Sequence, residues 1–121
     1  MTKTILTVDD SRTMRDMLRM ALTDAAYEVV QAVDGAHGLE VLDTCEPDVI
    51  VTDINMPNLD GFGFIEKVRS GGRHSGVPIL VLTTESEPEK KARARAAGAT
   101  GWIVKPFDPV KLVDAIRRVA A

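Results

Sequence analysis

The sequence is poor in cysteine: Cys45 is the only one among 121 residues, so no intrachain disulfide can form. Extracellular scaffolds that depend on disulfides are excluded, and a reducing compartment is the expected location. Long apolar runs are also missing, because none approaches the roughly 20 residues that a membrane-spanning helix requires. Met1 lies a few residues before the first predicted strand, which leaves no room for a signal peptide. We therefore expect a cytoplasmic protein with no membrane partner.

An excess of basic residues is absent as well. The chain has 15 Lys and Arg against 18 Asp and Glu, and its formal net charge is −3. A nucleic-acid-binding domain shows a clear basic excess, so we expect no nucleic-acid partner. The sequence contains no glycine-rich Walker loop, which argues against a P-loop nucleotide-binding protein.

Short apolar segments alternate with amphipathic segments along the whole chain. Most of the apolar segments are continuously apolar, as in parallel strands that are buried on both faces. They predict strands over residues 4–8, 28–33, 49–52, 79–83 and 102–105. The segments between them predict helices over residues 13–25, 36–45, 62–70, 86–98 and 108–119. This alternation predicts an α/β fold of the (βα)₅ type, a doubly wound parallel sheet with helices on both faces. One domain over residues 1–121 is expected from the length.

The predicted helix ends carry several capping signals. Asp34 and Asp108 are expected N-caps of the second and fifth helices, and proline follows Asp108. Ser86 and Glu89 have the spacing of a capping box at the start of the fourth helix. The inner face of that helix is expected to consist of alanines (Ala92, Ala96 and Ala97), which would anchor it weakly.

Polar side chains lie at the ends of four predicted strands. Asp9 and Asp10 follow the first strand, Asp53 follows the third, Thr83 ends the fourth, and Lys105 ends the fifth. Parallel α/β sheets bind ligands at the carboxyl ends of their strands, so these side chains are expected to converge. Two carboxylates about 4 Å apart repel by roughly 4 kcal/mol at an effective dielectric of 20. The cluster therefore requires a cation.

Magnesium suits this cluster, because it takes carboxylate and carbonyl oxygens together with water. Lys105 is a second cation suited to phosphate, and Thr83 offers a hydroxyl donor. Carboxylates can accept phosphoryl groups as nucleophiles. The pattern predicts a phosphoryl-sized anion site around one carboxylate.

Four segments of the chain resemble response-regulator receiver domains in sequence and in order. They are ILTVDDS at 5–11, DINMPNLDG at 53–61, LTTE at 82–85 and KPF at 105–107. Within the family, the chain is most similar to the CheY-like, single-domain chemotaxis group. The resemblance implies a flavodoxin-like sheet of order 2-1-3-4-5.

The resemblance also implies roles for the strand-end residues. Asp53 would accept a phosphoryl group from a phosphohistidine of a chemotaxis-type histidine kinase. Asp10 would bind Mg²⁺ directly, Asp9 mainly through water, and Asn55 through its backbone carbonyl. Lys105 and Thr83 would contact the phosphoryl oxygens, and a cis bond is expected between Lys105 and Pro106.

The same resemblance implies how the signal would leave the protein. Phosphorylation would change the surface of the fourth helix, fifth strand and fifth helix, and so control a partner such as the flagellar motor switch protein or a phosphatase. Asn55 and Glu85 occupy positions that tune dephosphorylation, and their identities predict a short-lived phosphorylated state. Trp102 stands where a switching tyrosine is usual, and Lys91 stands where motor-binding relatives have an apolar residue. We expect a monomeric switch that dephosphorylates itself and is not an enzyme in other respects.

Two other functions fit the same residues. A phosphate sink or phosphorelay shuttle would keep the phosphoryl chemistry without binding the motor. A phosphatase with an aspartyl nucleophile usually has a second aspartate two residues after the first, where this chain has Asn55.

Several histidine and basic side chains are expected to have no role in the phosphoryl site. His37 and His74 are expected to be surface residues without a metal. Basic stripes on the first helix (Arg12, Arg15 and Arg19) and on the fourth (Lys90, Lys91, Arg93 and Arg95) are either solvated faces or docking surfaces.

Overall fold

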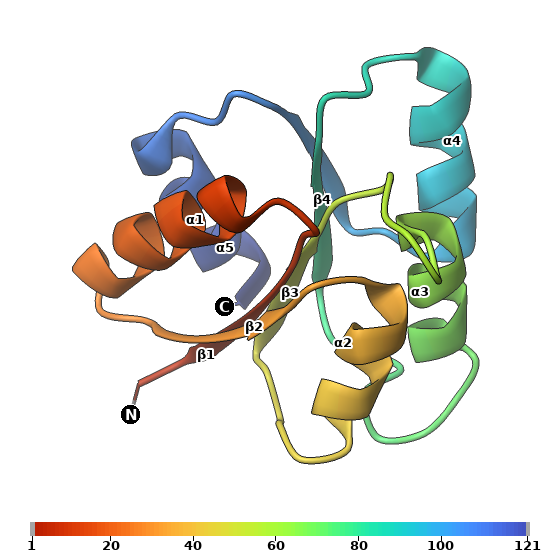
Figure 1. The fold of residues 1–121 in the computed structure, drawn as a ribbon, viewed down its shortest axis with the longest axis horizontal. Helices are drawn as coiled ribbons and strands as arrows, with labels where there is room; N and C mark the ends of the chain where they lie inside the picture. The colour runs from red at the N-terminus through yellow and green to blue at the C-terminus, as the bar shows by residue number, and fades with distance from the viewer. Residues whose placement is uncertain (1, 121) are drawn as a thin grey trace.

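A computed structural model of the chain describes residues 2–120, and a parallel sheet forms its middle layer (Figure 1). The strands are β1 (Thr4–Val8), β2 (Glu28–Ala32), β3 (Val49–Thr52), β4 (Ile79–Thr83) and β5 (Gly101–Val104). Their order in the sheet is β2-β1-β3-β4-β5, and every neighbouring pair is parallel. The predicted (βα)₅ fold and strand order are therefore confirmed.

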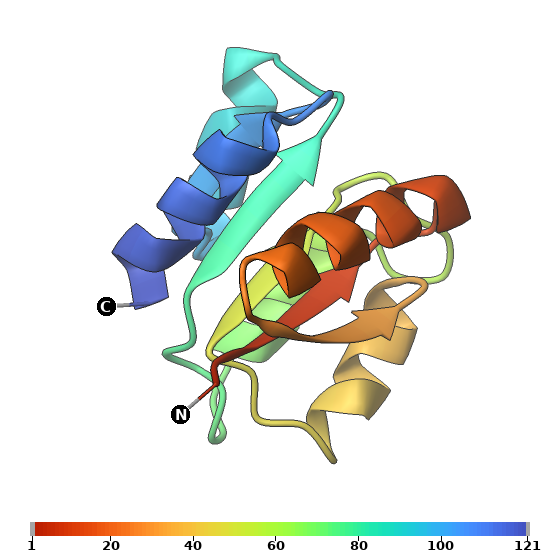
Figure 2. The same cartoon turned by 90° about the vertical axis from the view of Figure 1, so that its left-hand side faces the viewer.

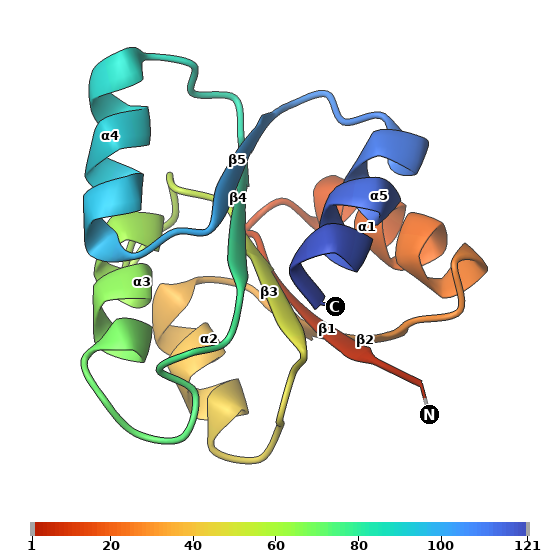
Figure 3. The same ribbon diagram turned by 180° about the vertical axis from the view of Figure 1, so that it is seen from behind.

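The helices cover both faces of this sheet, as Figures 2 and 3 show. They are α1 (Arg12–Asp24), α2 (Gly35–Leu42), α3 (Gly61–Arg69), α4 (Pro88–Ala97) and α5 (Pro109–Ala120). Helices α1 and α5 pack on one face, and α2, α3 and α4 pack on the other. Among residues 2–120, no helix is long and apolar enough to span a membrane.

Each face of the sheet has its own apolar core. On the side of α2, α3 and α4, Leu6 and Ile50 pack with Phe64. On the side of α1 and α5, Ile5 packs with Leu18, Leu22, Leu112 and Ile116. Strands β1, β3 and β4 are buried on both faces, as their apolar runs predicted, whereas the edge strands β2 and β5 are mostly half-buried.

Three helices begin at a side chain that accepts a backbone N–H. Ser11, Asp34 and Asp60 accept from the residue three positions on, at 3.2, 2.8 and 2.8 Å. At α5, Asp108 Oδ1 accepts from the N–H of Val110 at 2.9 Å. The predicted caps at Asp34 and Asp108 are confirmed.

The capping box predicted for α4 is wrong. Helix α4 begins at Pro88, so the N-cap is Glu87, whose side chain makes no capping hydrogen bond. Proline favours the first helical position, which moves the start of the helix one residue beyond the one that Ser86 would cap. Gly98 ends the helix with a φ of 117°, as the sequence predicted.

The alanines expected on the inner face of α4 are also partly misplaced. Ala94 is the buried one, Ala97 is half-buried, and Ala92 and Ala96 are exposed. The buried face of the helix is therefore centred on Ala94. Weak anchoring follows all the same, because a buried methyl group contributes about 0.8 kcal/mol, against roughly 1.5–3 kcal/mol for a large apolar side chain. Helix α5 buries three such side chains (Leu112, Val113 and Ile116).

Strands β1, β3 and β4 have the predicted bounds, and the boundaries that differ shift by one to three residues, which is ordinary for element ends. Strand β2 ends at Ala32 instead of Val33, and β5 covers residues 101–104 instead of 102–105. Helix α2 ends at Leu42, three residues before the predicted end.

Candidate functional site

Three acidic side chains meet at the carboxyl edge of the sheet. Oxygens of Asp9, Asp10 and Asp53 all lie within 4.8 Å of one another. The sheet ladder positions two of them, because Asp53 N donates to Val8 O at 2.9 Å and Asp9 N donates to Ala32 O at 3.1 Å. Asp9 is 2% exposed and Asp53 is 8% exposed, whereas Asp10 is exposed to solvent.

Lys105 reaches into this cluster from the end of β5. Its Nζ lies 2.9 Å from Asp9 Oδ2 and 2.7 Å from Asp53 Oδ2. Burial lowers the pKa of Lys105, but the hydrogen bonds to Asp53 and Asp9 outweigh burial, and the pKa is raised. Burial raises the pKa of Asp9 in spite of the Ser11 N–H and Lys105 beside it. The bond from Lys105 to Pro106 is cis, as the resemblance implied.

The charges of the cluster fit a divalent cation. Three carboxylates and one ammonium leave a net charge of −2 at neutral pH. All candidate ligands are oxygens, which is the donor set that Mg²⁺ prefers. Among the described residues, these acids form the single group of His, Cys, Asp and Glu side chains close enough to share a metal. The residues present therefore fit Mg²⁺, and the Asn55 carbonyl remains a predicted ligand.

Thr83 is buried at the end of β4. Its Oγ1 accepts a hydrogen bond from the backbone N–H of Glu85 at 3.3 Å. Because the hydroxyl acts as an acceptor in this contact, its own hydrogen is left to donate elsewhere.

Gly61 lets the loop after Asp53 close tightly. A Cβ at this position would lie 2.2 Å from the backbone oxygen of Asp53 and 2.8 Å from the Cα of Ile54. Gly61 N also donates to Ile54 O at 2.8 Å. The start of α3 is thereby drawn directly against the segment that carries Asp53.

Two residues of the site scaffold were not identified from the sequence. Arg15 Nη1 donates to the backbone oxygen of Asp9 at 2.8 Å, so this member of the basic stripe braces the acidic loop. Asn58 Nδ2 donates to Asp34 Oδ2 at 2.7 Å and links the Asp53 loop to the start of α2. The N–H of His37, and next Asn58, lower the pKa of Asp34. The only feature of the sequence that could have indicated this role of Arg15 is its position one turn into the helix that follows Asp9 and Asp10.

Glu85 lies beside the site in the loop between β4 and α4. Its side chain accepts from Asn55 Nδ2 at 2.8 Å and pairs with Lys90 Nζ at 2.9 Å. Its backbone oxygen accepts from Trp102 Nε1 at 3.1 Å. The hydrogen bond of Lys90, and next that of Asn55, lower the pKa of Glu85.

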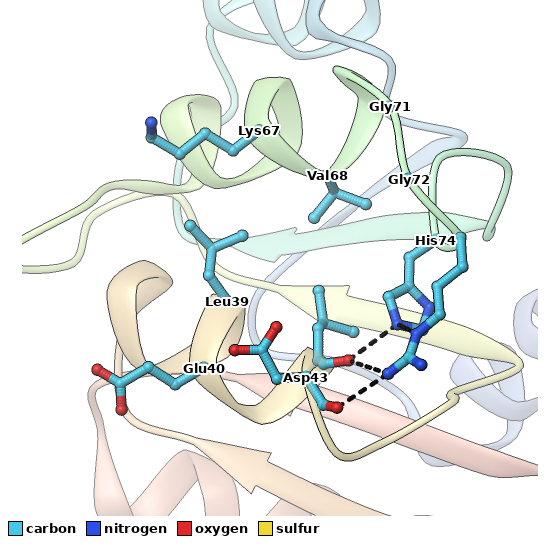
Figure 4. Close-up of a pocket in the computed structure, with 10 residues that line it drawn as sticks. Leu39, Glu40, Asp43, Lys67, Val68, Gly71, Gly72 and His74 are labelled. Carbon is cyan, nitrogen blue, oxygen red and sulfur yellow. Dashed lines mark hydrogen bonds between the residues drawn. The ribbon is translucent and has the colours of Figure 1, made fainter.

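The two histidines lie outside the acidic cluster and are half-buried at the surface, and the ring of each contacts a backbone atom. His37 Nδ1 accepts from Val33 N at 3.0 Å. His74 Nε2 lies 2.9 Å from Leu42 O, and Arg73 Nη2 donates to Leu42 O at 3.1 Å (Figure 4). The contacts of Arg73 and His74 meet the Leu42 carbonyl at the end of α2, beside a hollow of about 570 Å³ at the edge of the sheet opposite the acids.

Comparisons with known proteins agree with the resemblance seen in the sequence. Residues 5–117 match the family model described as the response regulator receiver domain. Chemotaxis protein CheY1 of Helicobacter pylori is 38% identical over 117 residues, which are 95% of this chain and 94% of that protein. A solved structure of chemotaxis protein CheY4 of Vibrio cholerae is 45% identical, has a TM-score of 0.93, and is matched over 98% of this chain and 99% of that one.

Similarity extends to longer proteins of another kind. A probable transcriptional regulator, ycf27 of Porphyridium aerugineum, is 36% identical over 115 residues. These residues are 95% of this chain but 47% of that protein, so the chain spans about half the length of this relative.

Proposed function

Given that the chain belongs to the response regulator receiver domain family, we propose that it is a chemotaxis-type phosphorylation switch. Asp53 accepts a phosphoryl group from a phosphohistidine of a chemotaxis-type histidine kinase. The observation that carries this proposal is the position of Lys105, whose ammonium contacts both Asp9 and Asp53. It supplies a positive charge on a flexible stem beside Asp53, a buried carboxylate that lies close to two other acids.

The transfer forms one bond and breaks one bond. An Asp53 carboxylate oxygen attacks the phosphorus, the P–N bond to the donor imidazole breaks, and the imidazole leaves with the bonding electron pair and takes a proton. Lys105 releases Asp53 Oδ2 and pairs with a phosphoryl oxygen, which its flexible stem permits. The Thr83 hydroxyl donates to another phosphoryl oxygen. Bound Mg²⁺ would supply the positive charge that offsets the acids and the transferring group, held by Asp9, Asp10, Asp53 and the Asn55 carbonyl.

The phosphoryl group adds a charge of about −1.5 to −2 at Asp53, and this charge drives the response of the switch. Drawing the Thr83 hydroxyl toward the phosphoryl group weakens its contact with Glu85 N, and the loop before α4 rearranges. The surface of α4, β5 and α5 then changes. A cytoplasmic partner such as the flagellar motor switch protein reads that surface, and the protein acts as a monomer without turning over an external substrate.

A phosphate sink or phosphorelay shuttle is the second candidate function. It is favoured by Lys91, which is exposed on α4 where an apolar contact is typical of motor-binding relatives. A pull-down of a motor switch protein by the phosphorylated form separates the two functions. Binding supports the switch, and its absence supports the sink.

The Asp53→Asn variant tests phosphoryl acceptance. Purified protein is incubated with a small phosphoryl donor and Mg²⁺, and incorporated phosphate is measured. Wild type and the matched control Asp24→Asn, at an exposed position, are expected to take up phosphate. Uptake by Asp53→Asn at the wild-type level would rule out the assignment, and a phosphoryl lifetime of hours in wild type would contradict fast self-dephosphorylation.

A further inference from the structure

Glu85 connects four separate parts of the molecule. Its N–H donates to Thr83 Oγ1 on β4 at 3.3 Å, and its backbone oxygen accepts from Trp102 Nε1 on β5 at 3.1 Å. Its Oε1 accepts from Asn55 Nδ2 at 2.8 Å, and its Oε2 pairs with Lys90 Nζ at 2.9 Å. Each polar atom of the residue therefore has a partner on a different element or loop.

Lys90 is the member of this group that belongs to α4. It lies in the first turn of that helix, whereas Asn55 lies two residues beyond Asp53 in the loop before α3. The Glu85 carboxylate thus joins the start of α4 to the residue next to the phosphoryl site. Helix α4 fully buries only Ala94 in the core, and the Glu85–Lys90 pair is a polar contact at its start.

We propose that Lys90 is a positioning residue, whose ion pair with Glu85 holds the Asn55 amide beside the Asp53 phosphoryl site and thereby lengthens the life of the phosphoryl group. This inference rests on the proposed function, and it requires that the Glu85 side chain keep its contacts with Lys90 and Asn55 when the Glu85 N–H loses Thr83 and the loop before α4 rearranges. It assigns to α4 a control over phosphoryl turnover, in addition to its part in the output surface.

The ion pair fixes Glu85 in two ways. With Lys90 on one oxygen and Asn55 on the other, the carboxylate cannot rotate without losing a hydrogen bond. Lys90 also compensates the negative charge of Glu85, and the pair lowers the pKa of Glu85 and raises the pKa of Lys90. Glu87 is a weaker competitor for Lys90, at 3.7 Å.

Removing Lys90 frees both Glu85 and Asn55. The carboxylate then carries an uncompensated charge, and the Asn55 amide loses a fixed acceptor, which opens a path for water to the phosphoryl group. The pair is partly exposed, with side chains 38% and 20% accessible. Because exposed ion pairs contribute little, the expected acceleration of phosphoryl loss is modest, roughly two- to fivefold.

The first experiment measures phosphoryl decay. Wild type, Lys90→Ala, Lys90→Arg and Lys91→Ala are loaded with phosphoramidate and Mg²⁺, the donor is removed, and loss of phosphate is followed. Lys91 is the matched control, because it is the next residue on α4 and has no ion pair in the part of the chain that the structure describes. Faster decay is expected in Lys90→Ala alone, with Lys90→Arg near wild type.

The second experiment separates positioning from a general effect of charge. In a Glu85→Ala background, Lys90→Ala should have no further effect on decay, because the residue through which it acts is gone.

Three outcomes overturn the inference. Equal rates of phosphoryl decay in Lys90→Ala and Lys91→Ala would refute the inference and leave the proposed function intact. An undiminished effect of Lys90→Ala in the Glu85→Ala background would do the same. Failure of the wild-type protein to take up phosphate removes the proposed function and the inference together.

Discussion

Lys105 carries most of the electrostatic compensation at the acidic edge of the sheet. It contacts two of the three clustered carboxylates, and its side chain is only 10% exposed. The strand-end positions of the acids and of Lys105 were evident from the sequence, because each follows an apolar run. The pairing of Lys105 with Asp9 and Asp53 was not evident from the sequence, because it depends on how far the lysine side chain reaches across neighbouring strands. The Glu85–Lys90 pair was also missed, because it depends on how the loop before α4 turns into the helix.

Replacing Lys105 by methionine should destabilise the protein in the absence of metal. Asp9 is nearly inaccessible, and a buried carboxylate that loses its cation partner costs free energy. We expect the free energy of unfolding to fall by about 1–3 kcal/mol, and millimolar Mg²⁺ to restore part of it. Urea unfolding with and without Mg²⁺ measures both effects. The exposed Lys111→Met is the control, and an equal loss in the two variants would contradict the role of Lys105.

Asp34 should make the stability depend on acid pH. Its pKa is lowered from 3.8 by the N–H of His37 and by Asn58, so its contribution is present above about 3.8 and is lost as the pH falls through the lowered value. Asp34→Ala should therefore cost about 1 kcal/mol at pH 7 and much less once the pH is below the lowered pKa. Urea unfolding at several pH values tests this, with the exposed Asp24→Ala as control. A difference between wild type and Asp34→Ala that does not change with pH would rule the mechanism out.

At the scale of elements, the largest errors of sequence interpretation concern α4. Its hydrophobic signal is weak because its inner face is small, so nothing in the pattern fixes its rotation to within one residue. The structure starts the helix at Pro88 and buries Ala94. Helices α1 and α5 carry large apolar side chains on one face, which bury Leu18 and Leu22 in α1 and Leu112, Val113 and Ile116 in α5.

Gly61→Ala should disturb the junction between β3 and α3. The new methyl group would meet backbone atoms of Asp53 and Ile54, which cannot rotate away. We expect a loss of about 2–3 kcal/mol in stability and slower phosphoryl uptake, despite the better helix propensity of alanine. Gly76→Ala is the matched control, because a Cβ there has no atom within 4 Å. Thermal unfolding and uptake measured on both variants give the test, and equal behaviour would show that the junction is more adaptable than the structure indicates.

In the molecule as a whole, one sheet lies between two apolar cores and contributes side chains to both. The central strands contribute side chains to both cores. If one core came apart, the strands that support the other core would lose the packing on one of their faces. The site depends on this arrangement, since its residues come from the ends of four strands that lie side by side.

Unfolding should therefore be a single transition. Trp102, the only tryptophan, packs against the core on the side of α4 and bonds to Glu85 O. We expect its fluorescence and the far-UV circular dichroism to change at the same urea concentration. An earlier fluorescence transition would show that β5 and α4 open as a separate unit.

The sequence by itself determined the element order, the buried strands and the residues at their carboxyl ends, because these follow from local apolar patterns and from chain direction in a parallel sheet. It also carried the resemblance from which the strand order was expected. Only the tertiary structure decided that Arg15 braces the Asp9 loop, that Asn58 reaches Asp34, and that Lys90 meets Asn55 through Glu85. Those contacts join segments without any fixed spacing in the chain. They exist only when packing brings flexible side chains within reach of one another.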